Sequence, residues 1–376
     1  MKINKTCKEI LHVLFEKGVK VSRFIDVYRK ENGNIDETLR YFLKYNELKL
    51  DYGRGGSDKR SGKCSSSSCK GIIDFVLKNR IGLLEIGNDD YPELLEKIHL
   101  PPPVLFYKGS KIKNLEFAIA VVGSRKYTTY GRDVAGYISK NLSGAGITVV
   151  SGLAAGIDSF AHMAAVKEKG GSIGVLGCGI DVVYPEENKF LYEKIPGNGA
   201  VITEFLPGTP PLKSNFPVRN RIISGLCSGV VVIEAGERSG AIITSEMALE
   251  QNREVFAIPG NIFNAASKGC HKLIKQGAKL VEKIDDILEE FSGYRDKIMN
   301  LDKKTVSFYN KYKEKNYNLS DSELKIYGFV GYKPKSVEEI VEYSGMDLKN
   351  ALNVIASLEM KQLIREDSFN KYVRIF

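Results

Sequence analysis

The chain has 376 residues, of which 43% are hydrophobic and 27% are charged, so it can form one large α/β core and one or two small modules. No apolar run approaches about 18 residues and the N-terminus lacks the apolar segment of a signal peptide, so we expect no membrane partner and a cytoplasmic location. The six cysteines are scattered, which favours reduced thiols over a disulfide framework. The net charge of +9 favours an anionic partner but does not locate its binding site.

Residues 1–70 predict a small N-terminal helical module followed by a linker. Apolar residues between Ile10 and Leu43 recur with helical spacing. Residues 51–70 are rich in Gly, Ser and Lys and show no apolar period, which indicates a flexible connection. The whole segment carries 16 Lys and Arg against 9 Asp and Glu, and therefore most of the excess positive charge.

Residues 71–292 predict a Rossmann-like domain of the α/β class. A helix near 71–80 and an extended strand after a triple proline come first. Short β-branched runs then alternate with helix-length segments, which indicates a doubly wound, mostly parallel sheet buried on both faces. The expected strands are 118–122, 147–150, 172–176, 200–203, 229–234 and 254–258.

Residues 293–319 are rich in Lys and predict a second linker, and residues 320–376 predict a winged-helix domain. Three helices, at 321–329, 336–343 and 347–360, precede a short hairpin. This module has 8 basic and 9 acidic residues, which does not favour binding to a duplex backbone. We expect a protein-contact or regulatory module. The alternative is a transcription regulator with a ligand-sensing α/β domain, which duplex binding by this module alone would support.

Glycine-rich turns follow four of the predicted strands. In a parallel sheet all strands end at the same edge, and ligands bind there. Each turn can direct backbone N–H groups at an anion, so four of them favour an anionic ligand. They contain Gly123, Ser124 and Arg125 with Thr128 after the first strand, Gly152 after the second, residues 177–181 after the third, and Ser239 and Gly240 after the fifth.

The absence of known binding motifs from these turns argues against several classes of anionic ligand. The first turn reads GSRKYT instead of G-x-G-x-x-G, and the second strand ends in Ser-Gly without the acidic residue that binds a dinucleotide ribose. The sequence has no P-loop motif, no Ser-His-Asp order and no cluster of metal ligands. We therefore expect no cofactor, no metal and no catalytic residue. These residues alone leave open a nucleotide phosphate or a nucleic-acid phosphate.

Residues 212–226, LKSNFPVRNRIISGL, favour nucleic acid. Asn215 or Ser214 can cap a helix whose first turn carries Pro217. Arg219 and Arg221 then follow near the positive end of the helix, an unfavourable place for two cations, which predicts an anion between them.

The alternative is that these arginines form salt bridges with an acidic neighbour such as Glu204 or Glu234. Basic residues interleaved with aromatic ones, without a readout helix, are typical of single-stranded nucleic acid sites. Here tyrosines and Phe216 lie among the basic residues. The expected DNA-binding residues are Gly123, Ser124, Arg125, Thr128, Gly152, Lys213, Asn215, Arg219, Asn220, Arg221, Ser239 and Gly240.

Six motifs carry a resemblance to a known family. They are GSRKYTTYG at 123–131, SGLAAGIDSFAH at 151–162, GCGIDVVYPEEN at 177–188, FPVRNRIISGL at 216–226, RSGAIITSEMA at 238–248 and REVFAIPGNIFNAASKGCHKLIKQGA at 253–278. Over residues 91–289 the chain resembles the DprA/Smf family, the DNA-processing protein A family.

The resemblance implies a Rossmann-like domain that binds single-stranded DNA without sequence preference. It also implies a homodimer that protects incoming DNA and loads the recombinase RecA onto it during natural transformation. The family's DNA-contacting arginine corresponds to Arg125, its basic residue ahead of the FPxRN motif to Lys213, and its arginine pair to Arg219 and Arg221. The N-terminal module lacks the Gly-Ile-Gly hairpin usual in this family.

The alternative function is a nucleotide-processing enzyme of the phosphoribohydrolase-like Rossmann group. Those enzymes use a PGGxGTxxE motif with a catalytic Glu and Arg. Glu234, Arg238 and Glu246 lie in the corresponding loop, EAGERSGAIITSE, but the motif itself is absent.

Overall fold

The structure is a computed structural model that describes residues 5–16, 18–44, 69–110, 112, 115, 117–291, 293, 319–331, 334–361, 363–368 and 370–374. The linker expected at 51–70 lies outside the described residues, except for Cys69 and Lys70, which begin helix α4 (Cys69–Lys78). The linker expected at 293–319 also lies outside them, apart from its first and last residues. Among the described residues, no helix is long and apolar enough to cross a bilayer.

The N-terminal helices pack on the edge of the central domain. They are α1 (Lys5–Leu11), the π-helical turn η1 (His12–Glu16), α2 (Val21–Lys30) and α3 (Ile35–Lys44). Tyr28 donates to Glu96 at 2.6 Å, and Cys7 donates to the buried Glu85 at 2.8 Å. These contacts anchor the helices to α5 (Glu93–Glu96) and β1 (Gly82–Glu85).

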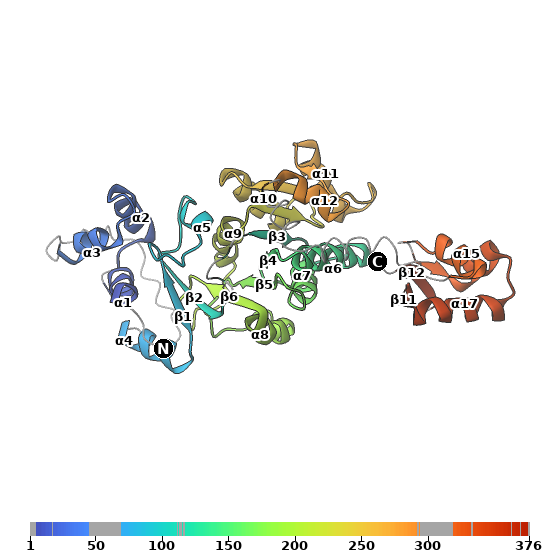
Figure 1. Ribbon diagram of the computed structural model, residues 1–376, viewed down its shortest axis with the longest axis horizontal. Coiled ribbons are helices and arrows are strands. Elements are labelled where there is room, and N and C mark those ends of the chain that lie inside the picture. The colour runs from blue at the N-terminus through green and yellow to red at the C-terminus, as the bar shows by residue number, and fades with distance from the viewer. Residues whose placement is uncertain are drawn as a thin grey trace.

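The central sheet has nine strands in the order β1-β2-β6-β5-β4-β3-β7-β8-β9 (Figure 1). The neighbouring pairs from β6 to β9 in this order are parallel, whereas β2 pairs antiparallel with both β1 and β6. This confirms the predicted Rossmann-like, mostly parallel sheet. The remaining strands are β2 (Val104–Gly109), β3 (Ala118–Val122), β4 (Thr148–Ser151), β5 (Ser172–Val175), β6 (Gly199–Thr203), β7 (Gly229–Val232), β8 (Glu254–Ala257) and β9 (Lys279–Leu280).

Helices cover both faces of the sheet because the strand side chains alternate. Ile119 and Val121 of β3 pack with one core cluster, which contains α6 (Thr129–Gly144), α7 (Ile157–Ala165) and α12 (Ile284–Leu288). Ala120 of β3 packs with the other cluster, on the opposite face. That face holds α8 (Lys189–Lys194), α9 (Asn215–Gly225), α10 (Gly240–Glu250) and α11 (Lys268–Lys275).

The strand order reverses at β3. The chain runs from β3 outward through β4, β5 and β6, and then crosses back to place β7 on the other side of β3. A ligand crevice in an open α/β sheet lies outside the carboxyl ends of the strands at such a switch point. The turns that follow β3, β4 and β7 therefore form the expected binding edge.

The C-terminal module has three helices and a three-stranded antiparallel sheet in the order β10-β12-β11. Side-chain caps fix its helix starts, because Ser320 and Ser336 each form a capping box with a Glu three residues later. These elements follow the predicted order, and the winged-helix assignment stays a prediction. Their bounds are α15 (Asp321–Phe329), β10 (Lys335–Ser336), α16 (Val337–Ser344), α17 (Leu348–Met360), β11 (Ile364–Ser368) and β12 (Lys371–Arg374).

Candidate functional site

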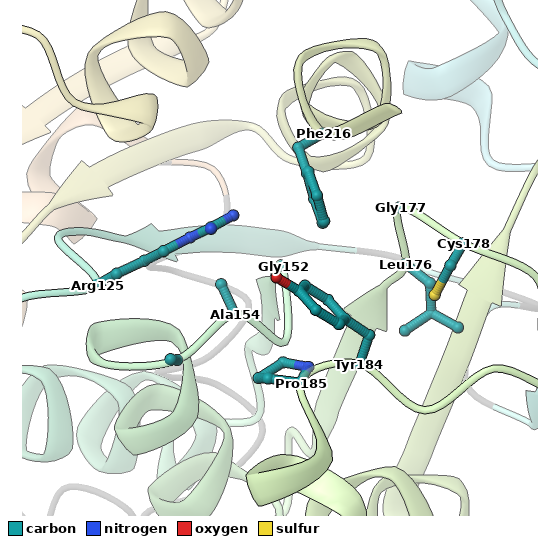
Figure 2. A pocket seen from close by; sticks show the side chains of 10 residues that line it. Arg125, Gly152, Ala154, Leu176, Gly177, Cys178, Tyr184, Pro185 and Phe216 are labelled. Carbon is teal, nitrogen blue, oxygen red and sulfur yellow. The ribbon is translucent and has the colours of Figure 1, made fainter. Parts of the chain in front are cut away.

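A shallow hollow lies at the carboxyl edge of the sheet, where three turns and the start of α9 meet (Figure 2). Arg125 comes from the turn after β3, Gly152 from the turn after β4, Tyr184 from the loop after β5, and Phe216 from the first turn of α9. The sequence predicted that these turns share one edge, and the structure brings them together around one hollow. Its volume is about 40 Å³, far below the roughly 300 Å³ of a pocket that encloses a small molecule.

One cation and two aromatic rings border this hollow at its surface. The Arg125 guanidinium carbon lies 5.1 Å from the centre of the Phe216 ring, and the Tyr184 ring lies 5.6 Å from the Phe216 ring. Arg125 is exposed and Tyr184 is 39% exposed. No carboxylate among the described residues pairs with Arg125, so its forked donors can meet an external anion beside ring faces that can stack on bases. We call Arg125, Tyr184 and Phe216 the Arg125 surface.

Arg219 lies beneath this surface and does not face solvent. It is 3% exposed, and its guanidinium donates to the carbonyl oxygen of Gly152 at 2.6 Å and to that of Val175. The structure therefore does not present Arg219 to an external anion, because its donors are bound to carbonyls at the ends of β4 and β5. The helix explains this placement: α9 begins at Asn215, so Arg219 lies past its first turn, facing inward.

Asp158 and His162 complete the buried layer around Arg219. Asp158 accepts from the backbone N–H of Gly152 at 3.1 Å, and burial raises the pKa of its carboxyl although Arg219 opposes this. Burial and, to a lesser extent, the neighbouring Arg219 together lower the pKa of His162 to about 3, and one ring nitrogen lies 2.7 Å from the Ser172 hydroxyl. Burial also lowers the pKa of Arg219, to about 10. We call Asp158, His162 and Arg219 the Arg219 layer.

Gly152 lines the hollow and is also hydrogen-bonded to the Arg219 layer beneath it. A Cβ atom there would lie 2.7 Å from an Arg219 nitrogen and 2.8 Å from an Asp158 oxygen, so only glycine fits. Its N–H is bound to Asp158 and its carbonyl to Arg219. In this structure the Gly152 N–H predicted to bind phosphate donates instead to the carboxylate of Asp158.

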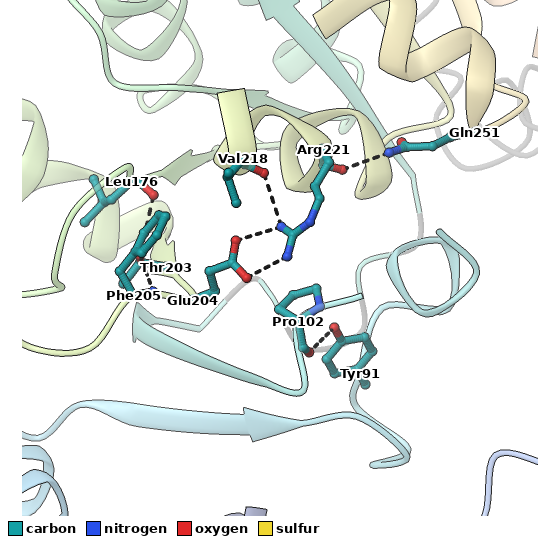
Figure 3. Close-up of polar contacts among 9 residues, drawn as sticks. All are labelled: Tyr91, Pro102, Leu176, Thr203, Glu204, Phe205, Val218, Arg221 and Gln251. Carbon is teal, nitrogen blue, oxygen red and sulfur yellow. Dashed lines mark hydrogen bonds and ion pairs between the residues drawn. The ribbon is translucent and has the colours of Figure 1, made fainter. Parts of the chain in front are cut away.

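Arg221 forms the salt bridge that the sequence left as an alternative (Figure 3). Its two terminal nitrogens donate to the two carboxylate oxygens of Glu204 at 2.7 and 2.6 Å. Both side chains are mostly buried, with 15% and 12% exposed. The expected contact between Arg221 and an anion is therefore corrected: Glu204 holds its fork in a bidentate pair.

Glu234 holds the Gly-Ser-Arg turn from below. It is 1% exposed and accepts from the backbone N–H of Thr128 at 2.9 Å and from its hydroxyl at 2.5 Å. Thr128 in turn caps α6 by accepting from the N–H of Gly131. The Ser124 hydroxyl donates to the Lys126 carbonyl and closes the same turn. Thr128 and Ser124, predicted as DNA contacts, therefore shape the turn that presents Arg125.

The other predicted residues lie around the rim. Lys213 is exposed and has no ion pair with a described residue, whereas Asn215 donates to the carbonyl of Gly177 at 3.2 Å. Asn220 contacts the carbonyl of Gly240 at 3.5 Å, which joins α9 to α10. Ser239 precedes α10, and its buried hydroxyl has no hydrogen-bond partner among the described residues. Gly123 packs against Ile157, and Gly240 is exposed.

The sequence motifs did not indicate that Asp158, His162 and Glu234 support the binding edge from below. A signal for Asp158 was present, because a carboxylate in the first turn of a helix after a glycine-rich turn commonly binds backbone N–H groups. Nothing in the sequence distinguishes the buried Glu234 from a catalytic carboxylate, since both interpretations place it at the end of a strand.

Comparison with known protein families shows which family this chain belongs to. Residues 82–292 match the family model described as DNA recombination-mediator protein A. The chain belongs to this family. The match covers the central sheet and the whole edge that carries the Arg125 surface and the Arg219 layer, and it confirms the resemblance inferred from the six motifs.

Individual members of the DNA recombination-mediator protein A family are similar to this chain in sequence and in structure. The DNA processing protein DprA of Streptococcus pneumoniae is 49% identical over 207 residues, which are 55% of this chain and 73% of that protein. An X-ray structure of DprA from the same species superposes with a TM-score of 0.60 at 35% identity, covering 77% of this chain and 99% of that chain. A DprA structure from Helicobacter pylori, reported for its single-stranded DNA binding mode, superposes with a TM-score of 0.52 at 24% identity. It covers 57% of this chain and 96% of that chain, and shares the fold.

Proposed function

We propose that this protein binds single-stranded DNA without base preference at the Arg125 surface. The observation that carries the proposal is an exposed arginine with no carboxylate partner among the described residues, placed over Phe216 and beside Tyr184. Phosphate binds the guanidinium, and bases stack on the two rings. The relative from Helicobacter pylori, whose structure was reported for single-stranded DNA binding, supports the choice of ligand.

An open surface suits a continuous strand better than a single nucleotide. A hollow of about 40 Å³ cannot enclose a nucleotide and exclude water from it, as an enzyme of the phosphoribohydrolase type requires. Glu234, the carboxylate that such an enzyme needs, is buried and bonded to Thr128. The geometry therefore supports a binding protein without catalysis, and absence of free-base release from nucleoside monophosphates tests this.

Membership of this family is also the basis for proposing what happens after the protein binds DNA. The bound strand is protected and handed to the recombinase RecA, so that homologous recombination can follow natural transformation. We further propose that the protein acts as a cytoplasmic homodimer, which presents two such surfaces to DNA. Sedimentation of the protein alone, and RecA filament assembly on strands coated with the single-strand-binding protein SSB, with and without this protein, test these steps.

The primary test is fluorescence anisotropy of a labelled oligo-dT across a salt series. Arg125→Ala is expected to weaken binding about tenfold and to make the slope of log affinity against log salt shallower by about 0.7, the value for one phosphate contact on a single strand. Lys167→Ala is the matched control, because it removes one exposed positive charge beyond the end of α7. Equal effects of the two variants would contradict the proposal.

A further inference from the structure

The C-terminal module contacts the central domain next to the Arg125 surface. The hydroxyl of Thr129 donates to a carboxylate oxygen of Asp367 at 2.8 Å, and Arg365 donates to Asp133 at 2.7 Å. Thr129 is the first residue of α6 and lies four positions after Arg125, while Asp367 lies on β11. In Figure 1 the module lies beside α6, at the right of the central sheet. The contact therefore lies on the segment that presents Arg125.

A cleft of about 750 Å³ separates the two bodies beside this contact. This volume is within the range of sites that bind small molecules, and it is much larger than the hollow at Arg125. Thr128, which lies three residues after Arg125, lines the cleft. One wall comes from the start of α6 and the loop at 259–264, and the other from the C-terminal module, including Lys335.

The loop that borders the cleft exposes two large apolar side chains. Ile262 is 71% exposed and Phe263 is 90% exposed, between Asn261 and Asn264, which both line the cleft. This loop follows β8, so it lies at the same carboxyl edge of the sheet as the Arg125 surface. An exposed aromatic ring at the rim of a site for a single strand is a stacking platform for a base.

Asp367 lines the cleft where it contacts Thr129, four residues after Arg125. Its carboxylate accepts a hydrogen bond from Thr129, as a phosphate oxygen does from a hydroxyl. A negative charge at this position repels the backbone of a strand that runs from Arg125 toward the cleft. The contact is exposed, and exposed charged contacts of this kind are weak, so an incoming strand can displace it.

We propose that a single strand bound at Arg125 continues into this cleft, stacks on Phe263, and displaces Asp367 from Thr129. The proposal rests on the function proposed above and extends the same site to the C-terminal module. It makes this module one wall of the DNA path and Asp367 a latch that is closed when DNA is absent.

DNA strands of two lengths distinguish binding that extends into the cleft from binding at the Arg125 surface alone. The full-length protein is titrated with labelled oligo-dT of about 6 and about 20 nucleotides, since sites of this class span about 4–16 nucleotides. Phe263→Ala is expected to weaken binding of the long strand about fivefold and to leave the short strand unchanged. Asp367→Ala is expected to strengthen binding of the long strand about threefold, again without effect on the short one.

Glu342→Ala is the matched control for Asp367→Ala, because it removes one exposed negative charge from α16 of the same module. The proposal is overturned if either variant leaves the long strand unchanged, if short and long strands respond equally, or if Glu342→Ala matches Asp367→Ala. Failure of the parent to bind either strand would instead refute the function proposed for the Arg125 surface. Thermal unfolding of each variant shows that the module remains folded.

Discussion

The Arg125 surface and the Arg219 layer each contain an arginine close to Phe216, yet the two side chains differ in every other respect. The guanidinium carbons lie 5.1 and 5.9 Å from the ring centre. Arg125 is exposed and has no carboxylate partner among the described residues, whereas Arg219 is buried and bonded to two carbonyl oxygens. We infer that the exposed arginine serves binding and the buried one holds the turns in place.

The largest expected effect distinguishes the two arginines by stability. Arg219→Ala leaves the buried Asp158 without its neighbouring cation and two carbonyls without a donor, which should lower the free energy of unfolding by about 3–5 kcal/mol. Arg125→Ala should change it by less than about 0.5 kcal/mol, since the side chain is exposed. Urea unfolding of both variants measures the difference, and similar losses would remove the distinction.

The next effect concerns the ring that both arginines contact. Phe216→Ala removes the stacking partner of a base and should weaken binding to oligo-dT by about 1–3 kcal/mol. Tyr127→Ala is a suitable control, because Tyr127 is 45% exposed near the same turn but packs edge-on against Phe160. If Tyr127→Ala weakens binding as much as Phe216→Ala, the strand does not follow the path described.

The third prediction concerns how the stability of the protein depends on pH through His162 of the Arg219 layer. His162 is fully buried with its pKa lowered to about 3, so the unfolded chain takes up its proton first as pH falls below about 6.5. Its contribution to stability is therefore complete above pH 6.5 and decreases toward pH 3, by at most about 1.4 kcal/mol per pH unit. His162→Gln should flatten the pH dependence of unfolding in this window, and an unchanged slope would show that His162 is not buried as a neutral ring.

The smallest expected effect is on DNA binding by Arg221→Ala. Because Glu204 holds both terminal nitrogens of Arg221, this variant should change the affinity for oligo-dT by less than about twofold. The double variant with Glu204→Ala avoids a buried unpaired carboxylate and should be more stable than Arg221→Ala alone. Loss of binding in the double variant would place Arg221 among the DNA contacts after all.

The sequence predicted the six core strands to within one or two residues because buried parallel strands are apolar without interruption. It did not predict β9, which has two residues, or β1, whose GLLE run has only four. The sequence placed Arg125 and Phe216 at the same edge of the sheet because their motifs are local, and both line one hollow in the structure. The roles of Arg219 and Arg221 depend on which face of their helix points inward. The role of Thr128 depends on Glu234, which lies 106 positions away in the sequence. Local residue spacing cannot predict either kind of contact.

The bond between Thr128 and Glu234 has a consequence for protein synthesis. The turn that carries Arg125 emerges from the ribosome early, but the carboxylate that fixes it is 106 positions later. β3 likewise needs β7 as its neighbour before the switch point exists. A nascent or truncated chain that ends before Glu234 therefore lacks the carboxylate that holds the Gly-Ser-Arg turn. Under the function proposed above, the competence to bind DNA arises late in translation, when both halves of the sheet have paired.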